Sequence, residues 1–174
     1  IAEIAKQVLR DAKDTISNQL GNFTFLTYED GTLAFRQTDT AVAEDKIQNE
    51  TDALNTAVTA FNEVQEKKNV GAAQKTVVDA AKNLNDKIIA EKAEIEAQEL
   101  SAAKEDAKVQ IIGNNTDYIT FKNTDTTLSF ETTTATAVDT TALNEAVTAF
   151  NAVKNKDGVA AAQKTVVANA KAIN

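Results

Sequence analysis

The stretch ALNTAVTAFN at residues 53–62 recurs almost unchanged as ALNEAVTAFN at residues 142–151. At the same spacing along the chain, AAQKTVV at residues 72–78 recurs without change at residues 161–167. Matches of this length in one register indicate an internal duplication, because self-similarity at a fixed period is the signature of repeat architectures. The unit that is repeated therefore decides the fold.

Upstream of each match, alternating apolar residues predict a β-hairpin. In the first copy these residues are Phe23, Phe25, Leu33 and Phe35. In the second copy they are Ile119, Phe121, Leu128 and Phe130. Asp30-Gly31 between the first two runs favours a tight hairpin turn. The second copy has no glycine at its turn, and we expect that turn to differ in length by one residue.

Residues 1–20 predict an amphipathic helix that precedes the first hairpin. Apolar residues recur there at three- and four-residue spacing, namely Ile1, Ile4, Ala5, Val8, Ala12, Ile16 and Leu20. This spacing places them on one face of a helix, and Gly21 follows as a stop signal. We therefore expect this face to line a core.

The repeated stretches themselves predict the next helix in each copy. It begins near Thr51 in the first copy and near Thr140 in the second, because Thr and its neighbours cap helix N-termini. It ends at Asn69 and at Gly158, which occupy matching positions and tolerate the left-handed conformation that ends many helices. Its apolar stripe includes Phe61 in the first copy and the matching Phe150 in the second.

The segment from Gly71 to about Ile112 contains no Pro and no internal Gly. It consists of strong helix formers, and its apolar face shifts near residues 89–93. We therefore expect one continuous helix over about 72–111 whose first half closes the first copy and whose second half opens the second. The predicted fold class is mainly α with small β-hairpins (α+β), as two tandem helix–hairpin–helix–helix repeats, residues 1–88 and 89–174, joined by this shared helix.

Composition narrows the function. The 174 residues include no Cys, His, Met, Trp or Pro, and the net charge is −8. Without Cys and His, the usual zinc ligands and the commonest general base are missing. The acidic balance argues against nucleic acid as a partner, and no apolar run is long enough to insert into a membrane. Because residue 1 is not Met, we expect a processed chain or a piece of a longer one.

Candidate sites are few. Most carboxylates lie in charged helical segments beside Lys, which favours a solvated surface over an acid–base pair. Asn114, Asp117 and Asp125 cluster around the second hairpin and could hold Ca²⁺, although such residues also favour turns. Lys75 and Lys164 are kept in both copies and mark either a binding face or common descent. We therefore predict no catalytic, cofactor-binding or metal-binding residue and no cofactor.

These observations favour a non-enzymatic structural repeat module of an extracellular or virion assembly, such as a surface layer, filament, stalk or appendage. Such a module spans distance and self-associates, with copies of itself or neighbouring repeats as partners. The missing Cys fits an extracellular or cell-surface location. The alternative is an adhesin-like module that presents its hairpin loops to a glycan or protein, because the loops at 26–32 and 122–127, and the segment at 43–50, differ between the copies.

Overall fold

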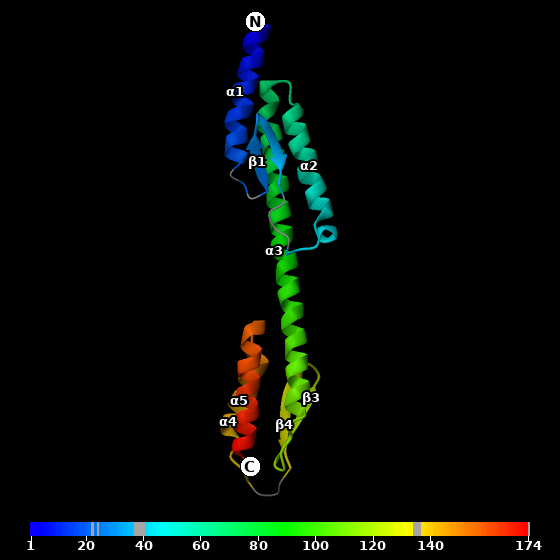
Figure 1. Ribbon diagram of the computed structural model, residues 1–174, viewed down its shortest axis with the longest axis vertical. Coiled ribbons are helices and arrows are strands. Elements are labelled where there is room, and N and C mark those ends of the chain that lie inside the picture. Colours follow the sequence, from blue (N-terminus) through cyan, green and yellow to red (C-terminus); the bar gives the residue numbers. More distant parts are fainter. Residues whose placement is uncertain (22, 24, 37–40, 134–136, 174) are drawn as a thin grey trace. The chain divides into compact units, whose positions relative to one another are not determined.

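The computed structural model describes residues 1–21, 23, 25–36, 41–133 and 137–173 (Figure 1). Within these residues the chain is mostly helical and contains two antiparallel two-stranded hairpins, which confirms the predicted α+β class. The chain divides into two compact units, Ile1–Ala93 and Glu94–Asn174.

The first unit begins with a helix and a hairpin and continues into two helices. Its elements are α1 (Ala2–Leu20), β1 (Leu26–Glu29), β2 (Thr32–Phe35), the short 3-10 helix η1 (Glu44–Lys46), α2 (Gln48–Glu63) and the first part of α3 (Lys67–Ile112). The second unit contains the rest of α3, β3 (Ile119–Thr124), β4 (Thr127–Thr132), α4 (Thr141–Ala152), the 3-10 helix η2 (Lys156–Gly158) and α5 (Val159–Ala172).

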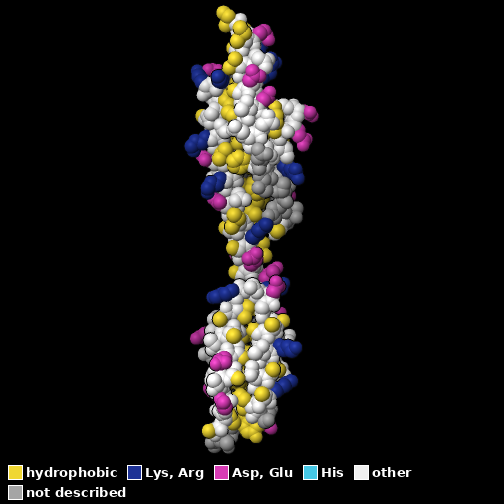
Figure 2. Space-filling model, turned by 90° about the vertical axis from the view of Figure 1, so that its left-hand side faces the viewer, with side chains coloured by type: hydrophobic (Ala, Val, Ile, Leu, Met, Phe, Trp, Pro, Cys, Tyr) yellow, Lys and Arg dark blue, Asp and Glu magenta, His cyan; other side chains and the backbone are white. Residues whose placement is uncertain are grey.

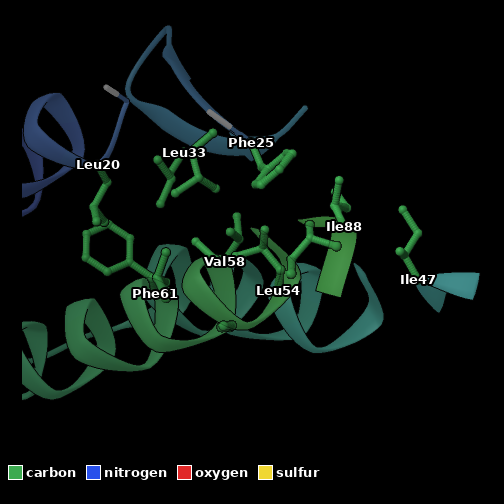
Figure 3. Close-up of a cluster of buried hydrophobic side chains, with 14 of the residues drawn as sticks. Leu20, Phe25, Leu33, Ile47, Leu54, Val58, Phe61 and Ile88 are labelled. Atoms are coloured by element: carbon green, nitrogen blue, oxygen red, sulfur yellow. The ribbon is translucent and has the colours of Figure 1, made fainter. Parts of the chain in front are cut away.

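The core of the first unit lies between the hairpin and the helices. Phe25 and Leu33 of the hairpin segment point toward Leu54 and Val58 of α2 (Figure 3). Phe61 is 1% exposed, as the predicted phase of this helix requires. Burial of such side chains contributes about 25 cal/mol per Å² of apolar surface, so this sandwich supplies the main stabilisation of a hairpin that would be marginal alone.

The core of the second unit uses matching residues. Phe150 of α4 is 1% exposed, and Leu128 of β4 is 2% exposed. Phe121 and Phe130 lie opposite each other in the hairpin with their rings edge to face, at a centroid distance of 6.3 Å. Aromatic pairs in this geometry add to the stabilisation that burial alone provides.

Helix α3 runs without interruption from Lys67 to Ile112 and so includes the helix predicted over about 72–111. Buried residues from Val70 to Ile88 belong to the core of the first unit, while Ala107 and Ile111 belong to that of the second. Lys87 and Glu91, which lie one turn apart on this helix, form an ion pair at 2.7 Å.

The predicted ends of α2 and α4 are wrong, whereas α4 begins at Thr141, directly after the predicted Thr140. Helix α2 begins at Gln48 and ends at Glu63, and α4 ends at Ala152. The chain leaves each helix at a valine, Val64 or Val153, with φ −56° in both cases and ψ 127° or 130°. Any residue adopts this extended conformation, so no glycine or asparagine is needed. Asn69 lies inside α3, and Gly158 has φ −79°.

The prediction that the two hairpin turns differ in length is also wrong. The register pairs Glu29 with Thr32 and Thr124 with Thr127, so both turns have two residues. Asp30 and Asp125 take φ values of 51° and 54°. Asp is among the few residues that tolerate this left-handed region, which is why the second turn forms without glycine.

Two apolar groups predicted to be buried are exposed instead. Ile1, Ile4 and Val8 of α1 are exposed, and this helix reaches the core only through Leu9, Ile16 and Leu20. Phe23 precedes β1 and is 41% exposed. In the first hairpin Leu26 lies opposite Phe35, and the matching pair in the second hairpin is Phe121 and Phe130.

Candidate functional sites

An asparagine at the end of α2 binds the hairpin of the first unit. Asn62 Nδ2 donates to the backbone oxygen of Leu33 at 2.8 Å, and Leu33 N donates to Asn62 Oδ1 at 3.2 Å. A carboxamide carries the same donor and acceptor as a peptide group, so Asn62 pairs with β2 much as a neighbouring strand would. The backbone oxygen of Asn62 in turn accepts a hydrogen bond from Lys13 Nζ of α1 at 2.7 Å.

The second unit contains the same arrangement. Asn151 Nδ2 donates to the oxygen of Leu128 at 2.9 Å, and Leu128 N donates to Asn151 Oδ1 at 3.0 Å. Lys104 Nζ of α3 donates to the oxygen of Asn151 at 2.8 Å. We call each set of lysine, asparagine and leucine an asparagine clamp. It ties two helices and one strand together in each unit.

The lysines of the two clamps, Lys13 and Lys104, are partly buried. Burial lowers the pKa of Lys13 from its ordinary value. Burial also lowers the pKa of Lys104, and the nearby charges of Lys154 and Lys108 add to that effect. Each lysine donates to a carbonyl at the end of a helix, where the helix dipole favours a positive charge.

A second link between helix and hairpin differs between the units. In the first unit, the hydroxyl of Tyr28 on β1 donates to Asp14 Oδ1 of α1 at 2.5 Å. This hydrogen bond raises the pKa of Tyr28, with burial and the charge of Asp14 contributing less. The bond attaches β1 to α1.

In the second unit the corresponding link is an ion-paired lysine. Lys108 of α3 is 2% exposed, and its Nζ donates to Glu105 Oε1, to the oxygen of Thr126 at 3.0 Å and to Asn123 Oδ1 at 3.4 Å. A buried charge is stable only when it is paired and hydrogen-bonded. Lys108 meets that condition and attaches the β3–β4 turn to α3.

The polar residues proposed as Ca²⁺ ligands do not converge. Asn114 Nδ2 donates to the oxygen of Gln110, the backbone oxygen of Asp117 accepts from Thr133, and Asp125 lies in the β3–β4 turn. In the part of the chain that the structure describes, no group of three or more Asp, Glu, His or Cys residues is placed to hold a metal ion. The cluster supports local turns.

The residues before β3 bind its outer edge. Asn115 Oδ1 accepts from Phe121 N at 2.8 Å, and Thr116 Oγ1 accepts from Ile119 N at 3.0 Å. The same edge receives one backbone bond, from Thr116 N to the oxygen of Ile119 at 3.0 Å. These bonds explain why polar residues gather ahead of the second hairpin.

The surface offers shallow hollows and scattered charges. A hollow of about 480 Å³ on α5 is lined by Asn114, Ala160, Gln163, Lys164, Val167, Ala168 and Lys171. Gln163 there donates to Gln110 at 2.7 Å, which gives this repeated glutamine a structural role. On the face in Figure 2, basic and acidic side chains are interspersed and form no broad patch of one sign. Among the described residues, no helix is both long enough and apolar enough to cross a bilayer.

Comparison with known proteins returned no relatives. No protein-family model matches the chain, and no curated protein or solved structure is significantly similar to it.

Proposed function

We propose that the chain is a non-enzymatic structural module, built from two tandem copies of one unit, that serves an extracellular or virion assembly. The observation that carries this proposal is the asparagine clamp, which occurs at matching positions in both units. In each unit the clamp joins the same kinds of element, a helix before the hairpin, the second strand and the helix after it. Both clamps hold the shape of the unit through hydrogen bonds between its helices and its hairpin.

The sequence of α1 supports the tandem arrangement. Ala2-Glu3-Ile4 matches Ala93-Glu94-Ile95 of α3, and Ala12-Lys13 matches Ala103-Lys104 at the same spacing. The second half of α3 therefore corresponds to α1: each is the helix that precedes the hairpin of its unit. The first part of α3 corresponds to α5, because both contain the repeated AAQKTVV and both are the last helix of their unit. Repeat arrays are built from units in which each contacts only its neighbours, and a helix that contributes to two consecutive units is consistent with such an array.

Self-association through the hairpins requires free strand edges. Leu33 and Leu128 use their outward backbone groups in the clamps, and Ile119 and Phe121 use theirs upstream of β3. Pairing with another chain is therefore restricted to the remaining edge positions. We expect association to be weak in solution and to require high local concentration, as in a surface array.

The argument for the alternative adhesin-like role is weaker, because it rested partly on a difference between the hairpin loops and both turns have the same length. What still differs is the segment before α2, where η1 is present. A glycan- or protein-binding role would have to use that segment, and its test is binding that is lost when residues 43–47 are replaced by the shorter connection of the second unit.

Analytical ultracentrifugation over a wide concentration range tests the assembly role, together with immunogold electron microscopy of the native source. We expect concentration-dependent oligomers and labelling at regular intervals outside the cell or on the virion. A monomer at every concentration, with label inside the cell, would contradict the proposal.

A further inference from the structure

Lys108 is a buried amine at a position that the first unit fills with a neutral residue. Of the described residues, it is the one charged side chain counted as buried. The matching position in the first unit is Ser17, which is also buried but uncharged. Burying a lysine costs several kcal/mol unless the charge is fully compensated, so a unit that needs only a helix–hairpin contact could use a neutral residue, as the first unit does.

The surroundings of Lys108 contain an electrophile and a base. Nζ lies 3.4 Å from Oδ1 of Asn123, and the carboxamide carbon of Asn123 is one bond beyond that oxygen. Glu105 Oε1 contacts the same nitrogen. The side chain of Glu105 is 53% exposed, whereas that of Lys108 is 3% exposed.

We propose that Lys108 and Asn123 form an intramolecular isopeptide bond, with Glu105 as the general base. Glu105 accepts a proton from the Lys108 ammonium, and the neutral amine attacks Cγ of Asn123. The new Nζ–Cγ bond forms, and the Cγ–Nδ2 bond breaks. Glu105 gives the proton that it holds to Nδ2 and takes a second proton from Nζ, and Nδ2 leaves as ammonia. The products are one amide and one ammonia, with no change of oxidation state and no external reactant.

Proximity makes this exchange possible without an enzyme. Two side chains held in reacting geometry behave as if one were present at about 10⁵–10⁸ M, and a positioned base activates a lysine nucleophile. The hydrogen bond from Lys108 Nζ to the oxygen of Thr126, at 3.0 Å, holds the amine against the turn that follows Asn123. The reaction occurs once per chain and attaches α3 to β3 permanently.

The first unit is a natural control. Its matching residues are Asp14, Ser17 and Tyr28, which provide an acid but neither an amine nor a carboxamide. The cross-link is therefore confined to the second unit.

Mass spectrometry of the intact, folded chain tests the proposal. We expect a mass lower than that of the sequence by one ammonia, and a digest in which the peptide containing Lys108 is joined to the one containing Asn123. Asn123→Ala and Lys108→Arg should both restore the full sequence mass. Arg keeps the buried positive donor, but its guanidinium is not deprotonated in proteins and cannot attack. Glu105→Gln should slow the loss of ammonia at least tenfold.

Loss of ammonia by cyclisation at another asparagine would also lower the mass. That event would survive in Lys108→Arg and would give no joined peptide, and either result overturns the proposal. A wild-type chain that keeps its full mass after prolonged incubation at neutral pH overturns it as well. The wild-type measurement decides the matter even if a variant fails to fold.

Discussion

The two units attach hairpin to helix at matching positions with different chemistry. In the first unit Tyr28 donates to Asp14, and the buried Ser17 stands at the position that matches Lys108. Glu105, Lys108 and Asn123 make a buried ion-paired network in the second. The hydrogen bonds of the clamp, which join two helices and one strand, are the same in both units, whereas the second link between helix and hairpin differs.

Removing a central aromatic residue should test whether the units are independent. We expect Phe61→Ala and Phe150→Ala each to lower the free energy of unfolding by about 3–5 kcal/mol, because both side chains are fully buried. Hydrogen exchange should show lost protection mainly in the unit that carries the change. Equal loss in both units would mean that they unfold together and that the comparison describes one domain.

A proline in α3 should separate the effects of the shared helix from those of the two cores. Ala90 is exposed, and Ala90→Pro removes a backbone hydrogen bond at a cost of about 3 kcal/mol. Circular dichroism should show a loss of helix, while protection of amides around Phe61 and Phe150 persists. Ala2→Pro is the matched control, since proline is tolerated in the first turn of a helix.

The clamps should contribute equally. Asn62→Leu and Asn151→Leu each leave the outward backbone groups of a leucine without partners, which costs about 1–3 kcal/mol. Chemical denaturation of the two variants should give losses that agree within about 1 kcal/mol, the usual scatter of such measurements. If only one variant lost stability, the two clamps would contribute unequally to the free energy of unfolding although their hydrogen-bond distances are alike.

The smallest effect concerns pH and only the first unit. The raised pKa of Tyr28 means that the folded state favours the protonated phenol. Its contribution is therefore present below pH 10 and is lost as pH rises through the raised pKa. We expect the melting temperature of the wild type to fall more steeply above pH 10 than that of Tyr28→Phe. Tyr118→Phe is the control, and an identical slope for wild type and Tyr28→Phe would contradict the assignment.

The sequence predicted the elements better than their ends. Repeated apolar positions such as Phe61 and Phe150 fix which helical face is buried, and both proved buried. The ends at Val64 and Val153 were missed, because an extended valine leaves no compositional mark. Ile4 and Val8 have the spacing of a buried stripe, but α1 extends past the hairpin that covers its second half, and spacing alone does not reveal where a covering element stops.

The candidate sites were less accessible to sequence reasoning. Asn62 and Asn151 end both repeated stretches, which is the signal that could have identified them. Their hydrogen-bond partners, the backbone groups of Leu33 and Leu128, depend on how α2 and α4 pack across the hairpins. No local sequence pattern predicts that packing. Lys108 sits in a run of charged helix formers and resembles a surface lysine until the β3–β4 turn is placed over it.

The clamps also bear on how the protein folds. Asn62 and Leu33 are separated by 29 residues in the sequence, and Asn151 and Leu128 by 23. Both pairs lie within one unit, so each clamp closes without contacts from the other unit. Each unit can therefore reach its final hydrogen bonds soon after its own last helix is available. In an array of repeated units, each unit depends for its folding only on its own contacts and those with its neighbours.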